Sequence, residues 1–87
     1  MITMHHLLEY EACNGSLNDF NRAFKHKRFL HLSIDHFYVI NRLVQKVRLI
    51  EKGLASEAFK HAVDEELEST CDTAETIARM RSIAIQD

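Results

Sequence analysis

The chain has 87 residues, 46% of them apolar and 28% charged, with a net charge of −2; this is the composition of one globular domain rather than of a disordered segment. Two glycines and no proline exclude the many tight turns of a sandwich or barrel and the glycine-rich loops that bind phosphate. We therefore expect a single all-α domain over residues 1–87.

The pattern of apolar and capping residues predicts a small bundle of three to four helices, over about 3–13, 17–31, 34–52 and 54–85. Asn14, Gly15 and Gly53 suit the left-handed conformation that ends a helix. Ser16 and Ser33 suit the N-cap position at which a helix begins.

Two of these boundaries remain open. No glycine or proline forces a break near Ser33, so the pattern also allows one helix from 17 to 52. Serine, threonine and aspartate gather between 69 and 76, and these residue types favour caps over helix interiors. A kink or break near 70–73 is therefore compatible with the fourth helix.

The third predicted helix is apolar around most of its circumference, because 13 of the 22 residues from Phe29 to Ile50 are large and apolar. Such a helix must be covered on several sides, and a chain this short offers few partner helices. We therefore expect a homo-oligomer, most simply a symmetric dimer. The residues predicted to self-associate are Phe37, Ile40, Asn41, Leu43, Val44, Val47 and Ile50. The alternative is a monomeric bundle with this helix at its centre.

Two polar residues lie among the apolar residues of the third predicted helix. Asn41 fits either a buried determinant of helix pairing or a half-exposed position at the edge of a stripe. His36 is expected to be a hydrogen-bonded core histidine rather than a ligand or a switch. Cys13 and Cys71 form no CxxC pair and no disulfide framework, which favours reduced thiols.

Charge is unevenly distributed along the chain. Residues 22–52 contain eight lysines or arginines and two acids, whereas residues 53–87 contain three bases and eight acids. One interpretation is that these opposite charges pair between helices or subunits. The other is a surface for a charged partner, with candidate residues Arg22, Lys25, Lys27, Arg28, Glu57, His61, Asp64, Glu65 and Glu68.

Catalysis and metal binding have little support in the sequence. No nucleophile, base and orienting residue stand in a recognisable arrangement, so we predict that the protein is not an enzyme. His61 has acidic residues one turn away on either side, but no Glu-x-x-His pair or cysteine cluster accompanies it. We expect no cofactor and no bound metal.

The sequence thus predicts a small regulatory or adaptor protein that binds another protein as a helical homodimer. The alternative is a nucleic-acid-binding dimer that uses the basic segment 22–52, in which Phe24 and Phe29 lie among the cations. A metal-binding helical bundle is a third class. No signal peptide and no run of about 20 apolar residues is present, so a cytoplasmic protein without membrane contact is expected.

Overall fold

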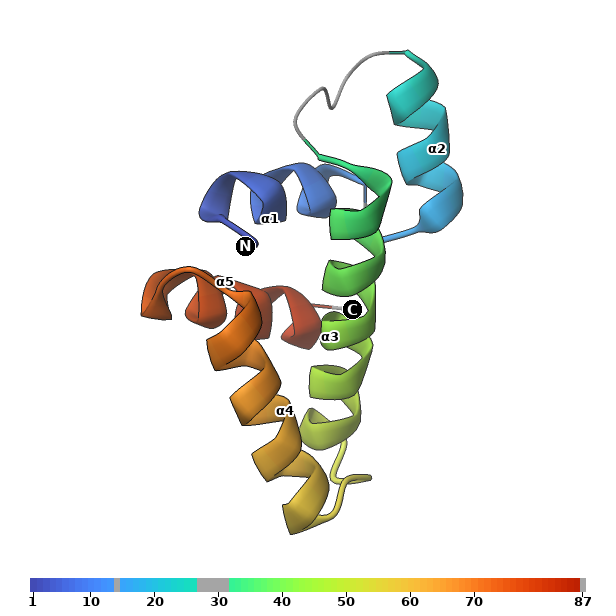
Figure 1. The fold of residues 1–87 in the computed structure, drawn as a ribbon. Helices are drawn as coiled ribbons and strands as arrows, with labels where there is room; N and C mark the ends of the chain where they lie inside the picture. Colours follow the sequence, from blue (N-terminus) through green and yellow to red (C-terminus); the bar gives the residue numbers. More distant parts are fainter. Residues whose placement is uncertain (14, 27–31, 87) are drawn as a thin grey trace.

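The computed structural model describes residues 1–13, 15–26 and 32–86, and these ranges form α-helices with no strand beyond a single β-bridge (Figure 1). The helices are α1 (Met4–Ala12), α2 (Leu17–Lys25), α3 (Ile34–Glu51), α4 (Glu57–Thr70) and α5 (Ala74–Ile85). The all-α class is confirmed. Within the described ranges, no helix has both the length and the apolar character needed to cross a bilayer.

Serine or threonine side chains cap the start of every described helix, each accepting a hydrogen bond from a backbone N–H three residues on. The N-caps are Thr3, Ser16, Ser33, Ser56 and Thr73. The end of α3 is a Schellman motif: Gly53 has a φ of 72°, and its N–H donates to the Ile50 carbonyl while the Leu54 N–H donates to that of Leu49. The predicted caps at Ser16 and Ser33 and the stop at Gly53 are confirmed.

The second and third predicted helices are separate, and the alternative of one helix from 17 to 52 is wrong. Helix α2 ends at Lys25 with His26 as its C-cap, and Ser33 opens α3 with a new N-cap bond to the His36 N–H at 3.1 Å. The predicted end of the second helix at 31 falls in 27–31, outside the described residues.

The fourth predicted helix, 54–85, is two helices. The chain is extended at Cys71, which forms a parallel bridge with Ile2. The Ile2 N–H donates to the Thr70 carbonyl at 3.1 Å, and the Asp72 N–H donates to the Ile2 carbonyl at 3.2 Å. The amino terminus therefore satisfies a carbonyl that the end of α4 leaves without a helical partner. Thr73 then caps α5, which folds back over α3.

Helix α3 lies at the centre of the molecule and is covered by its own chain. Helix α4 runs antiparallel along its second half, while α5 and α1 lie across it and against each other (Figure 1). Five of the seven predicted self-association residues, Phe37, Ile40, Leu43, Val44 and Val47, are fully buried in this single chain. The dimer was predicted because residues 54–85 were expected to form a single partner helix for α3. The break at 71–73 divides them into two helices, α4 and α5, and both pack against α3. One chain is therefore enough to cover these five side chains, and the homodimer stays a prediction.

Helix α2 is peripheral. It lies beside the first turns of α3, away from α4 and α5 (Figure 1). Phe20 and Ala23 are its buried residues, and the Phe20 ring stacks on Phe37 of α3 with centroids 4.6 Å apart. This aromatic contact, together with the buried Ala23 and the partly buried Leu17, attaches the helix to the core.

Candidate functional site

The predicted acidic surface exists as an exposed stripe along α4. Its members, all exposed on one face of the helix, are Glu57, His61, Asp64, Glu65 and Glu68. Several of them are already paired: Glu57 with Lys60 at 3.2 Å, His61 with Glu65 at 3.1 Å, and Asp64 with Arg81 of α5 at 2.6 Å. Exposed pairs such as these contribute little stability, so the stripe remains open to solvent and to other charges.

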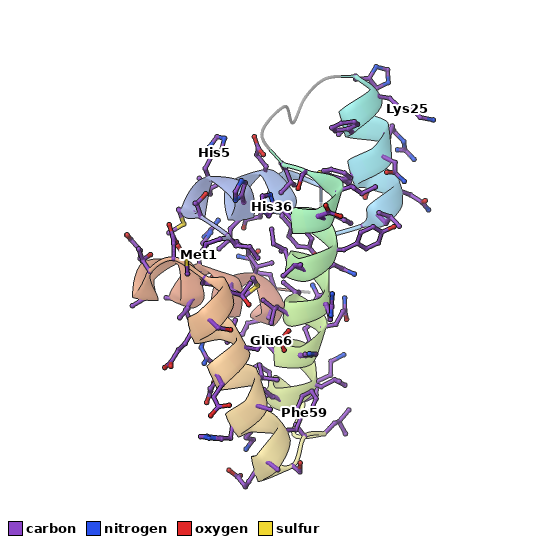
Figure 2. All side chains as sticks on the ribbon, in the orientation of Figure 1. Met1, His5, Lys25, His36, Phe59 and Glu66 are labelled. Atoms are coloured by element: carbon purple, nitrogen blue, oxygen red, sulfur yellow. The ribbon has the colours of Figure 1, made fainter. Side chains whose placement is uncertain are left out.

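The predicted basic surface is only partly described. Arg22 and Lys25 are exposed on α2, and Lys25 projects away from the body of the molecule (Figure 2). The Arg22 guanidinium lies 3.9 Å from the Asp19 carboxylate one turn earlier. Lys27 and Arg28 lie outside the described residues.

Two further cations of the segment 22–52 are used within the fold. The Lys46 ammonium lies 2.7 Å from Glu66 of α4. The Arg48 guanidinium donates to the Ala84 and Gln86 carbonyls at the end of α5, both at 3.3 Å. The basic segment is therefore not one continuous surface.

Among the described residues, ion pairs join helices at three interfaces, but only one of them, Lys46–Glu66, pairs the basic segment 22–52 with the acidic segment 53–87. The pairs are Lys46–Glu66 between α3 and α4, Arg81–Asp64 between α5 and α4, and Arg79–Glu11 between α5 and α1. All six side chains are partly exposed, so these pairs fix the orientation of the helices more than they stabilise the fold.

A series of aromatic rings joins α2 to α3 and is exposed at both ends. Phe20 and Phe37 form its buried centre. Phe24 stacks on Phe20 with centroids 5.7 Å apart, and Tyr38 meets the edge of Phe37 at 6.5 Å. Yet 54% of Phe24 and 47% of Tyr38 is exposed, and Ile34, one turn before Tyr38, is exposed as well. We call Phe24, Ile34 and Tyr38, with Arg22 and Lys25, the α2–α3 surface.

Sequence reasoning identified only part of this surface. The sequence places Phe24 among the cations, but it gives Ile34 only as one of the apolar residues between Phe29 and Ile50, which are expected to be covered. The apolar pattern of 34–50 alone does not distinguish Ile34 from the residues that α1, α4 and α5 cover. The exposure of Ile34 and Tyr38 follows from where the partner helices end, which depends on the tertiary fold.

Asn41 is a pairing determinant, but its partner is in the same chain. The Tyr10 hydroxyl donates to Asn41 Oδ1 at 2.9 Å, which joins α1 to α3. Burial raises the pKa of Tyr10 to about 12, so the phenol keeps its proton and remains a donor. The half-buried Asn41 therefore contributes a contact between α1 and α3 of one chain, and a role in pairing two copies stays a prediction.

The two thiols are buried and free, as reduced cysteines are expected to be. Burial raises the pKa of both Cys13 and Cys71, with smaller contributions from nearby carboxylates. A raised pKa lowers the thiolate fraction, which is the opposite of what a nucleophilic cysteine needs. Among the described residues, no three His, Cys, Asp or Glu side chains converge as metal ligands would.

In comparisons with known proteins, the chain matches no protein-family model, no curated protein and no solved structure. Its function is therefore inferred from the chemistry of its own residues.

Proposed function

We propose that this protein is a non-enzymatic regulatory or adaptor protein that binds an acidic protein partner through the α2–α3 surface. The supporting observation is the exposure of Phe24 and Tyr38 at the two ends of an otherwise buried series of rings. Aromatic anchors of this kind carry much of the binding energy at protein interfaces, because their burial removes a large apolar area from water.

The charge of the surface defines the partner. Arg22 and Lys25 are exposed close to Phe24 in the sequence and on the same helix, and Lys27 and Arg28 follow in the sequence. Exposed cations on the same helix as an aromatic anchor favour a partner that presents carboxylates near an apolar group. The acidic stripe of α4 is a surface with the required charge, so self-association through the α2–α3 surface is one form of this proposal.

Nucleic acid remains the second candidate, because cations interleaved with aromatic residues also suit phosphate and base stacking. Lys46 and Arg48 are engaged in contacts within the chain, and Asp19 lies beside Arg22, which reduces the positive charge available. The net charge of −2 also disfavours binding to the negatively charged phosphates of nucleic acid. These observations favour a protein partner over nucleic acid.

Affinity capture from an extract of the producing cells, with and without nuclease, tests the proposal. Phe24→Ser is expected to reduce recovery of the partner about tenfold or more, as loss of an aromatic anchor typically does. Leu54→Ser is the matched control, because Leu54 is 72% exposed at the opposite end of α3. It should recover as much partner as the unchanged protein. Circular dichroism of both variants should show the unchanged helical content.

Equal recovery by the unchanged protein and by Phe24→Ser would contradict the proposal. Recovery that nuclease abolishes would instead support the nucleic-acid candidate. In that case, changing Lys25, Lys27 and Arg28 together to Gln should weaken binding to all duplex sequences alike, since phosphate contacts carry no base information. Sedimentation of the protein alone distinguishes a second copy from a different partner.

A further inference from the structure

Two histidines stack where α1 meets α3. The rings of His6 on α1 and His36 on α3 have centroids 4.3 Å apart and planes inclined by 30°. The His36 label in Figure 2 marks this junction. Sequence reasoning expected His36 to be satisfied by hydrogen bonds, but its Nδ1 is inaccessible to solvent and has no hydrogen-bond partner among the described residues. The stack is the contact through which His36 meets α1.

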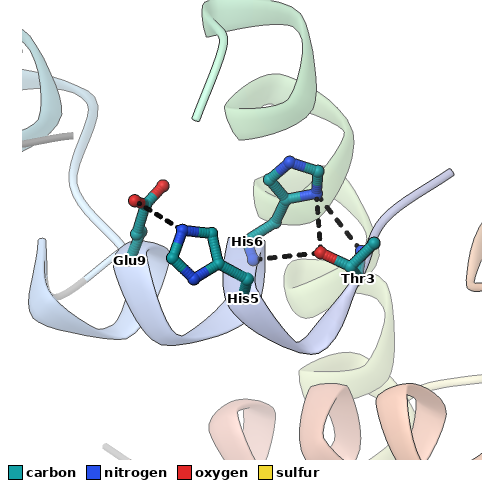
Figure 3. A network of polar contacts seen from close by, with 4 residues as sticks. All are labelled: Thr3, His5, His6 and Glu9. Carbon is teal, nitrogen blue, oxygen red and sulfur yellow. Dashed lines mark hydrogen bonds and ion pairs between the residues drawn. The ribbon is translucent and has the colours of Figure 1, made fainter. Parts of the chain in front are cut away.

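The neutral form of His6 is built into the start of α1. His6 Nδ1 accepts a hydrogen bond from the Thr3 N–H at 3.2 Å, and the Thr3 hydroxyl accepts one from the His6 N–H at 3.4 Å (Figure 3). These two bonds form a capping box. A proton on Nδ1 would place a donor against the Thr3 N–H donor and would leave the Thr3 hydroxyl oxygen, 3.3 Å from Nδ1, as its acceptor. Protonation of His6 therefore removes one of the two bonds of the capping box.

The surroundings of the His36 ring provide no acceptor at Nδ1 among the described residues. An imidazolium carries a donor on both ring nitrogens, and Nδ1 has no acceptor to receive its proton. Two stacked imidazolium rings would in addition place like charges about 4 Å apart in a half-buried site. Both effects oppose the doubly charged pair and leave the neutral pair unaffected.

We propose that the His6–His36 stack is an acid-sensitive contact, and that protonation of the His6 ring releases the start of α1 from α3. Release would separate Leu7, which is buried in the core, from the residues that cover it. Acid would thus expose an apolar part of the core while α3, α4 and α5 retain their own contacts.

Some of the surrounding charges favour a protonated His6 and others oppose it. The Glu9 carboxylate favours a charged His6, but it also lies 3.2 Å from His5, which shares α1 with it. His5 and the terminal amine of Met1 oppose a charged His6. Asp35, which precedes His36 on α3, is exposed.

The charged groups of the neighbouring elements have their own partners. Between α5 and α1, Arg79 pairs with Glu11, and the Asp72 carboxylate beyond α4 accepts from the Thr76 hydroxyl at 2.7 Å. The pKa of His6 is lowered from 6.5, chiefly by burial and next by the charge of His36.

The sign of the pH effect follows from this lowered pKa. The unfolded chain binds a proton at His6 more readily than the folded chain does, so stability is highest above the ordinary histidine pKa of about 6.5. It declines as the pH falls through that value and levels off below the pKa of the folded form. Each unit by which the folded pKa lies below the unfolded one lowers the folding equilibrium constant about tenfold in acid.

Urea unfolding one pH unit above and one unit below the ordinary histidine pKa of about 6.5 tests the proposal. The unchanged protein should lose stability in acid. His6→Gln should lose clearly less, because glutamine preserves a capping box but does not titrate. His61→Gln is the control: His61 pairs with Glu65 at i,i+4, as His5 does with Glu9, but lies on the exposed face of α4. It should behave like the unchanged protein.

Nuclear magnetic resonance of the unchanged protein gives an independent readout. The His6 ring should titrate below its ordinary pKa, and His36→Gln should move that midpoint upward. Amide exchange in α1 should also accelerate in acid relative to α3, after correction for intrinsic rates. A His6 midpoint at or above the ordinary value, or an equal acid loss in His6→Gln and the unchanged protein, would overturn the proposal.

Discussion

Val44→Asp is expected to unfold the chain. Val44 is fully buried at the centre of α3, and an unpaired carboxylate there costs several kcal/mol. The total stability of a domain of this size is only about 4–13 kcal/mol, so much or all of it would be lost. Far-ultraviolet circular dichroism with a urea titration measures the effect.

Gln45→Asp is the matched control for this change. Gln45 is the next residue of α3 and is exposed, so the same side chain there meets water. A loss below about 1 kcal/mol is expected, mainly from helix propensity. A Val44→Asp variant that remains folded would contradict the burial of this residue in one chain. If such a variant also changed from dimer to monomer, Val44 would lie at an interface after all.

Phe37→Ala is expected to lower the free energy of unfolding by about 3–5 kcal/mol, the usual cost of removing a buried ring. Phe37 is fully buried and stacks on Phe20 with ring centroids 4.6 Å apart. The ring of Tyr10 also contacts Phe37, with centroids 5.2 Å apart. Its removal leaves a cavity where α1, α2 and α3 meet. Chemical denaturation followed by circular dichroism checks the value.

Tyr38→Ala provides the comparison within the same turn of α3. Because 47% of Tyr38 is exposed, its removal should cost less than about 1 kcal/mol. Since Tyr38 belongs to the α2–α3 surface, the variant should instead weaken binding of the protein partner. Similar losses of stability at Phe37 and Tyr38 would mean that the aromatic series is not buried at its centre and exposed at its ends.

Local signals explain which parts of the fold the sequence predicts. The caps at Ser16 and Ser33 and the stop at Gly53 depend on single residues and their immediate neighbours, and all three are confirmed. The predicted range 34–52 differs from α3 by one residue at its end. First-helix boundaries also agree within the scatter of helix ends.

The break between α4 and α5 lies where the serine, threonine and aspartate residues near 70–73 allowed one, and Thr73 caps α5 there, so this alternative is confirmed. Apolar spacing continues from Val63 and Leu67 to Ala78 and Ile85, which also allowed one helix over 54–85. The break is stabilised by backbone bonds between Ile2 and residues 70–72, at the other end of the chain. This one missing contact also led to the predicted dimer interface, because it concealed a helix that covers α3.

The candidate sites also divide into features that follow from local sequence patterns and features that depend on tertiary contacts. The exposed stripe of α4 follows from helical periodicity and was predicted residue by residue. The hydrogen bond between Tyr10 and Asn41 and the stack of His6 on His36 join separate helices. Neither residue pair has a spacing or motif that would identify it in a single sequence, so each required the tertiary structure.

The burial of α3 within a single chain is tested most directly by urea unfolding over a hundredfold range of protein concentration. If one chain covers α3, the unfolding midpoint should be the same at every concentration. An obligate dimer behaves differently, because its stability increases with protomer concentration. A midpoint that rises steadily with concentration would show that α3 needs a second copy, and would contradict the single-chain core described by residues 1–13, 15–26 and 32–86.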